Sequence, residues 1–216
     1  MNFLTLNMLY TLLDKLVEWD REPEKAPRII IMKGAGDTAF CSGGDMRGLY
    51  DAYISIKPKV YQPTFTGTLY RTDNALANMK PIHIAIWNGY VFGSGAGICM
   101  RAPFTIATDN TEWAMPENVA GFIPDNGSSR FFANIRNCDL PIGLYLAITG
   151  ARVTGKNILK FGICSHFVPK DKLNALEQDL ITSVRKTTSK DEINTIINKY
   201  AETSIAKSLP DNYHKI

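Results

Sequence analysis

The sequence predicts an α/β fold with a largely parallel sheet and additional helices toward the C-terminus. Short, continuously apolar runs recur at 28–33, 81–87 and 104–108, and stretches with helical spacing lie between them. A strand that is buried on both faces of a parallel sheet typically has an unbroken apolar run of this kind. Because strand and helix alternate along the chain, we expect parallel strands joined by right-handed crossovers.

The first expected element is an amphipathic helix, because apolar residues recur with helical spacing from Leu9 to Val17. The run 28–33 is the first expected strand, and a turn-rich loop follows it over 34–44. Asp45 is placed to cap the next helix. A further helix over 64–79 is expected to stop at Lys80-Pro81, because the residue before a proline disfavours the helical conformation.

The second half of the chain continues the alternation. Its expected elements are strands at 81–87, 104–108 and 165–168 and helices at 98–100, 140–149 and 154–161. Gly150 and Gly162 follow the last two helices, as C-terminal capping glycines commonly do. The polar tail from Lys170 onward is expected to be helical, with Ser189 and Glu192 as a capping box. We therefore divide the chain into a core over 1–168 and a helical region over 169–216.

Composition is that of an ordinary soluble domain, with 216 residues, 45% of them hydrophobic, and a net charge of +3. This charge is too small to indicate a nucleic-acid partner. No apolar run approaches the roughly 20 residues that span a bilayer. Cys41, Cys99, Cys138 and Cys164 lack the spacing of a zinc site or a redox pair. We expect free, buried thiols.

Two glycine-rich loops are candidate binding elements. The first glycine loop, Ser42-Gly43-Gly44-Asp45, lies between a predicted strand and a helix start, and the second, Gly93-Ser94-Gly95-Ala96-Gly97, has the same setting. The second loop lacks the spacing of a dinucleotide fingerprint, and no phosphate-loop motif is present. Each loop could be a plain tight turn. Together they could supply backbone N–H groups to a developing oxyanion.

Two acids, Glu117 and Asp125, lie in a Pro- and Gly-rich segment with apolar neighbours, 113–127. Apolar surroundings raise the pKa of a carboxyl group, which suits it to general-base chemistry. Taken alone, the two acids could equally be solvated loop residues, because Asp and Glu are mostly exposed.

In combination and in order, these motifs resemble the crotonase superfamily of acyl-CoA hydratases, isomerases and hydrolases, and within it the branch that hydrolyses 3-hydroxyisobutyryl-CoA in valine catabolism. The matching segments are 4–8, 33–37, 40–45, 93–97, 114–125, 146–150, 162–168 and 198–202. The resemblance covers nearly the whole chain. It implies a crotonase-like ββα superhelix.

The resemblance also implies roles for single residues. The two oxyanion donors would be the backbone N–H groups of Gly44 and of Ser94, where the family usually has glycine. Hydratases of this superfamily carry two catalytic glutamates. The first position is Gly97 here and the second is Glu117, while Asp125 matches an aspartate of the hydrolase branch. Since addition of water across a double bond needs both acid/base groups, this pattern favours thioester hydrolysis.

Glu117 would attack the carbonyl or activate a water molecule, and the sequence leaves both routes open. Asp125 would bind the 3-hydroxyl or assist proton transfer. An acid that contacts substrate in the family aligns here with Thr68. Arg47 could meet CoA phosphates. The remaining residues expected to line the substrate and CoA site are Ala39, Phe40, Cys41, Ser42, Gly43, Asp45, Gly93 and Gly95.

The expected partner is an acyl-CoA substrate, with no cofactor beyond the CoA it carries, no metal, no nucleic acid and no membrane. The resemblance implies a mitochondrial location and allows a homo-oligomer. Compared with the family pattern, we expect the chain to be truncated at both ends. Two alternatives remain: an enoyl-CoA hydratase or isomerase, or a catalytically dead acyl-CoA-binding fragment.

Overall fold

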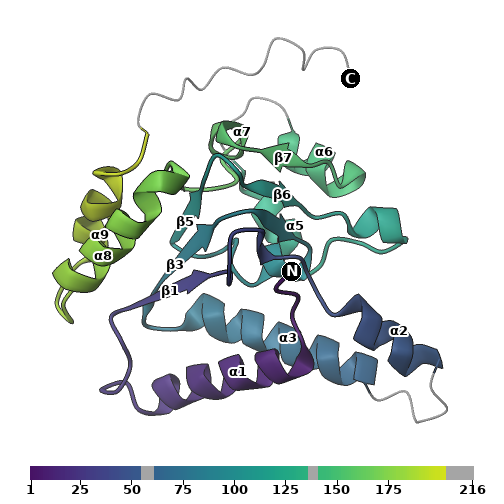
Figure 1. Cartoon of the computed structure of the whole chain (residues 1–216). Helices are drawn as coiled ribbons and strands as arrows, with labels where there is room; N and C mark the ends of the chain where they lie inside the picture. The colour runs from purple at the N-terminus through teal and green to yellow at the C-terminus, as the bar shows by residue number, and fades with distance from the viewer. Residues whose placement is uncertain (55–60, 136–140, 203–216) are drawn as a thin grey trace.

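The computed structural model describes residues 1–54, 61–135 and 141–202. Two four-stranded sheets form its centre (Figure 1). The first sheet has the order β1 (Ile29–Lys33), β3 (Ile82–Trp87), β5 (Phe104–Ala107) and β8 (His166–Phe167), with all pairs parallel. The second has the order β2 (Ala39–Cys41), β4 (Tyr90–Phe92), β6 (Glu112–Ala114) and β7 (Val153–Thr154), in which β7 runs antiparallel to β6.

From β1 to β6, consecutive strands enter alternate sheets, so that β1 and β2, β3 and β4, and β5 and β6 form successive ββ units. The α/β prediction and the expected ββα superhelix are therefore confirmed. The prediction of a simple loop over 34–44 was wrong, because β2 lies within it. Strands of three residues, such as β2, β4 and β6, are too short to leave a periodic signal in the sequence.

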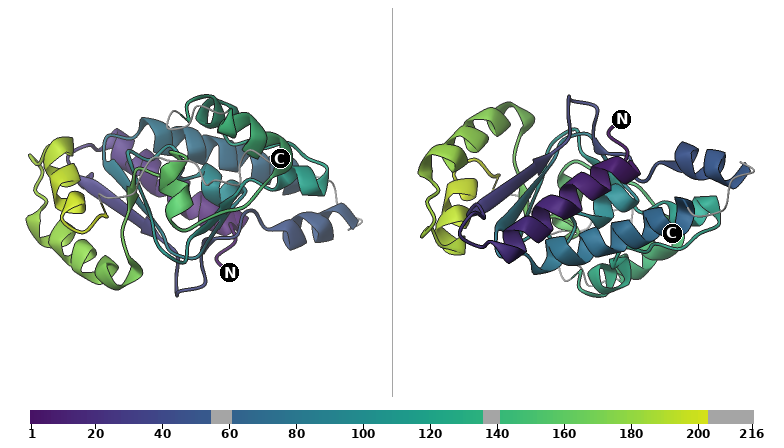
Figure 2. Two further views of the ribbon diagram at one scale, coloured as in Figure 1. Left: turned by 90° about the horizontal axis from the view of Figure 1, so that it is seen from above. Right: turned by 90° about the horizontal axis from the view of Figure 1, so that it is seen from below.

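Helices surround the sheets. They are α1 (Leu6–Arg21), α2 (Met46–Ile54), α3 (Tyr61–Asn78), α4 (Ser94–Gly97), α5 (Ser128–Ala133), α6 (Ile142–Thr149), α7 (Lys156–Lys160), α8 (Leu173–Ser183) and α9 (Lys190–Asn198), with 3₁₀ turns η1 (Glu117–Ala120) and η2 (Lys170–Lys172). Helices α1 and α3 lie side by side, and α8 and α9 lie together near β1 and β5 (Figures 1 and 2). No described helix is long and apolar enough to cross a membrane.

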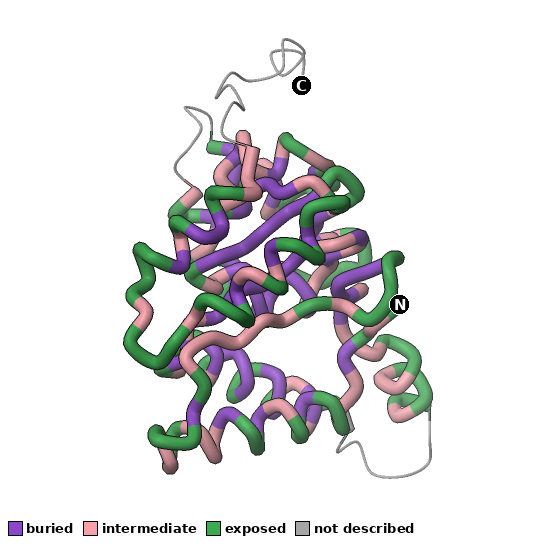
Figure 3. Tube along the Cα trace, turned by 60° about the vertical axis from the view of Figure 1, so that its left-hand side comes forward, coloured by how far each residue is buried: buried purple, intermediate pink, exposed green. Residues whose placement is uncertain are grey.

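The core has two parts, one on each face of the first sheet. Along β3, Ala85 and Trp87 belong to the larger cluster, which also contains Trp113 of β6, whereas Ile84 and Ile86 pack with α8 and α9. This alternation follows from the two-residue period of a strand. Figure 3 shows buried segments running through the middle of the molecule, with exposed turns around them. Burial on both faces is thereby confirmed for the strand predicted at 81–87.

Several local predictions can be checked. Asp45 caps α2, since its Oδ1 accepts from the Gly48 N–H at 2.9 Å, and the Ser189–Glu192 capping box is present. The strand at 28–33 is half-buried, because β1 is an edge strand. The helix expected at 98–100 lies instead at Ser94–Gly97.

The thiols of Cys41, Cys99 and Cys164 are free and buried. Cys138 and Leu140 lie outside the described residues, as does the tail beyond 202.

Candidate active site

The two glycine loops meet at one edge of the second sheet. They follow β2 and β4, which are parallel neighbours, so their carboxyl ends lie together. Gly43 has a φ of +105° and Gly93 a φ of +52°, values that favour glycine. A Cβ atom on Gly93 would lie only 4.0 Å from the Gly43 Cα atom. The close approach of the loops, which the sequence left open, is therefore present.

Gly44 and Ser94 place two backbone N–H groups at this junction. Leu4 forms a β-bridge with Gly44, in which the Leu4 N–H donates to the Gly43 carbonyl and the Asp45 N–H donates to the Leu4 carbonyl. Within the described part of the chain, the N–H groups of Gly44 and Ser94 themselves donate no hydrogen bond. The Ser94 Oγ atom lies 3.8 Å from where a Gly44 Cβ would be. Both N–H groups are thus free to donate, and their role as oxyanion donors stays a prediction.

Glu117 lies directly beside the second glycine loop. Strand β6 pairs with β4 and leads through Pro116 into η1, whose first residue is Glu117. Its Oε1 atom is 3.0 Å from where a Cβ on Gly93 would be, so a larger residue at 93 would press on the carboxylate and displace it by a few tenths of an ångström. The side-chain amide of Asn118 donates to carbonyls of α6 and holds η1 in place. The sheet register thereby brings the carboxylate to the two loops.

The environment of Glu117 favours its protonated form. Burial, and to a lesser extent the negative charge of Asp125, raise the pKa of Glu117 to about 7, against an opposing hydrogen bond from its own backbone. Its Oε2 atom is buried and has no hydrogen-bond partner among the described residues. A carboxyl group that titrates near neutral pH, with one oxygen unpartnered, is suited to act as a base or nucleophile.

Asp125 is half-buried and close enough to Glu117 to influence it electrostatically. Its Oδ2 atom accepts a hydrogen bond of 2.7 Å from the phenol of Tyr70 on α3. The two predicted acids therefore share one site, and their catalytic roles stay predictions. Sequence reasoning missed Tyr70, because nothing in a helix sequence indicates contact with a residue 55 positions away.

Asp73, also missed, lies one helical turn after Tyr70 and is 4% exposed. Neither of its carboxylate oxygens has a hydrogen-bond partner among the described residues. Burial raises the pKa of Asp73 to about 7; the charge of Arg101 opposes this rise and that of Asp125 adds to it. The Arg101 guanidinium donates to the Asp73 backbone carbonyl at 3.1 Å. The charge of Asp125 thus raises the pKa of both Glu117 and Asp73.

The position of the absent glutamate is filled by another side chain. A Cβ atom on Gly97 would lie 2.5 Å from the Asn126 Cβ and 2.7 Å from its Nδ2. Asn126 is 4% exposed, has a φ of +53°, and its amide atoms have no hydrogen-bond partner among the described residues. The chain therefore lacks a carboxylate at 97 and also lacks space for one.

Gly97→Ala is expected to lower the free energy of unfolding by about 1–3 kcal/mol, because the added methyl group overpacks against Asn126. Gly67→Ala is the matched control: Gly67 is a helical glycine on α3 with nothing within 4 Å of the added atom. Its replacement should stabilise the protein by up to about 1 kcal/mol. Urea unfolding of both variants measures the difference. Equal effects of the two substitutions would contradict the close packing at Gly97.

The remaining predicted contacts differ in accessibility. Ala39, Phe40 and Cys41 form β2 and are buried, so the structure does not expose their side chains to a ligand. Ser42 and Asp45 are half-buried, whereas Gly43 is buried. Gly95 is buried against Cys41. The Arg47 side chain is exposed and lies 3.8 Å from Asp51. Thr68 is buried and brings no carboxylate to the site.

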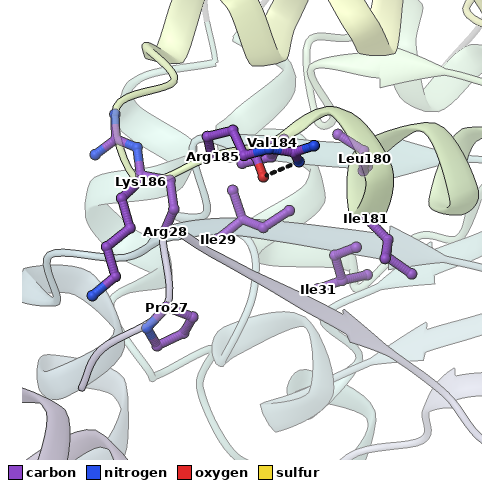
Figure 4. A pocket seen from close by; sticks show the side chains of 9 residues that line it. All are labelled: Pro27, Arg28, Ile29, Ile31, Leu180, Ile181, Val184, Arg185 and Lys186. Carbon is purple, nitrogen blue, oxygen red and sulfur yellow. Dashed lines mark hydrogen bonds between the residues drawn. The ribbon is translucent and has the colours of Figure 1, made fainter. Parts of the chain in front are cut away.

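No group of three or more His, Cys, Asp or Glu side chains in the described ranges could hold a metal ion. A groove lies elsewhere, between β1 and α8 (Figure 4). Ile29, Ile31 and Leu180 contribute to its apolar lining, and the Arg185 guanidinium beside it donates to the Val184 carbonyl. None of the predicted site residues lines this groove. The candidate active site is therefore the junction of the glycine loops with Glu117 and Asp125.

Comparison with known proteins agrees with this geometry. A family model described as enoyl-CoA hydratase/isomerase matches residues 1–216. The mitochondrial 3-hydroxyisobutyryl-CoA hydrolase of Homo sapiens is 36% identical over 200 residues, covering 93% of this chain and 50% of that protein. The protein of the same name from Dictyostelium discoideum is 35% identical, covering 99% and 55%. The chain spans about half the length of these curated relatives.

Solved structures show the same fold. A carnitinyl-CoA dehydratase from Mycobacterium thermoresistibile has a TM-score of 0.76 at 25% identity, covering 94% of this chain and 56% of that one. An enoyl-CoA hydratase from Rhodobacter sphaeroides has a TM-score of 0.74 at 24% identity, covering 89% and 59%.

Proposed function

Because the chain belongs to the enoyl-CoA hydratase/isomerase family, we propose that it hydrolyses the thioester of 3-hydroxyisobutyryl-CoA to 3-hydroxyisobutyrate and CoA. One observation carries the proposal: the two glycine loops meet at Gly43 and Gly93, Glu117 lies against Gly93, and Asn126 fills the space beside Gly97. A hydratase of this family needs a second carboxylate at that position. The names of relatives at 33–36% identity support the choice of substrate.

In the proposed mechanism, the thioester oxygen accepts hydrogen bonds from the N–H groups of Gly44 and Ser94. These donors stabilise the negative charge that develops on the oxygen as the carbonyl is attacked. The Glu117 carboxylate either attacks the carbonyl carbon, forming an anhydride that water then cleaves, or removes a proton from an attacking water molecule. In both routes the C–S bond breaks and CoA leaves as a thiolate. It takes up a proton from protonated Glu117 in the general-base route and from water in the nucleophilic route, and is released as the thiol.

Asp125 is assigned to the acyl group. Its Oδ2 atom is occupied by Tyr70, which leaves the other oxygen to accept a hydrogen bond from the substrate's 3-hydroxyl. No cofactor or metal enters this mechanism, and the acyl-CoA is the small-molecule partner. The main chain of β2 and of the first glycine loop would border the CoA moiety. A mitochondrial location is supported by the names of the relatives, and assembly into a homo-oligomer is part of the proposal.

The test is release of free thiol from 3-hydroxyisobutyryl-CoA, with isobutyryl-CoA, which lacks the hydroxyl, as the matched substrate. We expect release from both and a higher kcat/KM for the hydroxylated substrate. The hydrogen bond from the 3-hydroxyl to the Asp125 carboxylate should raise kcat/KM for 3-hydroxyisobutyryl-CoA by about tenfold or more over that for isobutyryl-CoA. Absence of thiol release from either substrate would overturn the proposed function.

Thiol release should rise with pH through a midpoint near 7. The pKa of Glu117 is raised to about 7, and both routes need the ionised carboxylate, so the fraction of active enzyme grows as pH increases from 6 to 8. Measurement of kcat/KM across this range, corrected for spontaneous hydrolysis, reads the midpoint. A rate that is already constant at pH 5.5 would contradict the raised pKa.

A further inference from the structure

We propose that Tyr70 is a positioning residue that holds Asp125 in the orientation in which it reads the substrate's 3-hydroxyl group. The inference rests on the proposed function and adds a residue to it. The phenol donates to the Asp125 Oδ2 atom at 2.7 Å, and among the described residues it is the only side chain that donates to this carboxylate. A carboxylate held by one oxygen presents its other oxygen in a defined direction.

The backbone around Asp125 explains why its carboxylate needs a tether. Asn126 and Gly127, the next two residues, both have positive φ values, +53° and +77°. The Ser128 N–H donates to the Asp125 carbonyl at 2.9 Å and closes the turn that starts α5. This turn fixes the main chain but leaves the Asp125 side chain without support from its own segment. The support comes from α3, the helix that carries Tyr70.

The charges around Asp125 would displace the carboxylate if Tyr70 were lost. Glu117 of η1 and Asp73 of α3 are the acids that interact electrostatically with Asp125. The charge of Arg101 lowers the pKa of Asp73. Above pH about 7, where Glu117 and Asp73 are ionised, both repel Asp125, so a side chain freed from Tyr70 gains by turning toward solvent. Its charge would then act less on Glu117, and the pKa of Glu117 would fall.

Tyr70→Phe removes the hydroxyl and keeps the ring. The ring also lines a groove between α1 and α3, together with Leu13, Val17 and Ala75. Because phenylalanine fills the same volume, we expect the packing of the two helices to survive the substitution. Tyr10→Phe is the matched control, since Tyr10 is a partly exposed tyrosine on α1.

The experiment measures kcat/KM of wild type, Tyr70→Phe and Tyr10→Phe with 3-hydroxyisobutyryl-CoA and isobutyryl-CoA between pH 5.5 and 8.5. We expect Tyr70→Phe to lose about tenfold on the hydroxylated substrate and less than twofold on isobutyryl-CoA. Its pH midpoint should move to lower pH, and Tyr10→Phe should match wild type. Equal losses on both substrates, or an unchanged preference and midpoint, would overturn the assignment while leaving the proposed hydrolysis in place.

A second readout needs no turnover. Burial, and after it the hydrogen bond to Asp125, raise the pKa of Tyr70 to about 12. Ionisation of this phenol can therefore be followed by absorbance as the difference between wild type and Tyr70→Phe. Asp125→Asn should move the titration of Tyr70 to lower pH. If this titration does not move, the contact is absent, whether or not the protein hydrolyses thioesters.

Discussion

Glu117→Gln is expected to lower kcat for thiol release by at least about 100-fold. General acid–base catalysis contributes roughly 10²–10⁴-fold, and a nucleophilic role would make the loss larger. Glutamine has the same shape, so the contact with Gly93 and the fold of η1 are retained while the ionisable group is lost. The pH dependence near 7 should disappear from the remaining activity.

Glu112→Gln is the matched control for this substitution. Glu112 lies on β6, five positions before Glu117, and pairs with Arg152 at 2.7 Å near the surface. Such a pair contributes about 0–1 kcal/mol to stability, so the control should keep full activity. Thiol release by Glu117→Gln within a factor of about three of wild type would show that another group drives the reaction.

Asp73→Asn is expected to change the pH dependence of stability. The pKa of Asp73 is raised from 3.8 to about 7 by burial, so the folded protein binds a proton more tightly than the unfolded chain. Stability contributed by this group is complete below pH 3.8 and is lost as pH rises toward 7. The loss amounts to roughly 4 kcal/mol. The asparagine variant should therefore be markedly more stable than wild type at pH 8.

Urea unfolding at pH 5 and pH 8 measures about 2–3 kcal/mol of this loss, because part of it has already occurred at pH 5. Asp20→Asn is the control. Asp20 is an exposed residue at the end of α1, and its replacement should leave the pH dependence of wild type unchanged. An Asp73→Asn variant that loses as much stability as wild type between pH 5 and pH 8 would contradict the burial of an ionisable carboxyl group at this position.

Much of the site could be predicted from local sequence. The two glycine loops were recognisable because each follows an apolar run, and the parallel pairing of β2 with β4 then brings them together. Glu117 and Asp125 were candidates because apolar residues and prolines surround them, but only the resemblance to the crotonase superfamily assigned them to the site. Asp45 and the Ser189–Glu192 capping box were predictable because capping depends on residues only three positions apart.

Other features depend on contacts between distant segments. The burial of Asp73 depends on how α3 packs against distant segments, among them that of Arg101, 28 residues away, whose guanidinium donates to the Asp73 backbone carbonyl. Asn126 leaves no space for a side chain at position 97, because a turn of positive-φ residues folds back onto α4. The second sheet was missed because its strands are two or three residues long.

The most direct test of the account compares two reactions of the same preparation. Free CoA released from 3-hydroxyisobutyryl-CoA and hydrated product formed from crotonyl-CoA are separated by chromatography and identified by mass. A site with Glu117 beside two glycine loops and no carboxylate at Gly97 predicts thiol release that depends on Glu117, without hydration. Hydration of crotonyl-CoA without release of thiol would contradict it.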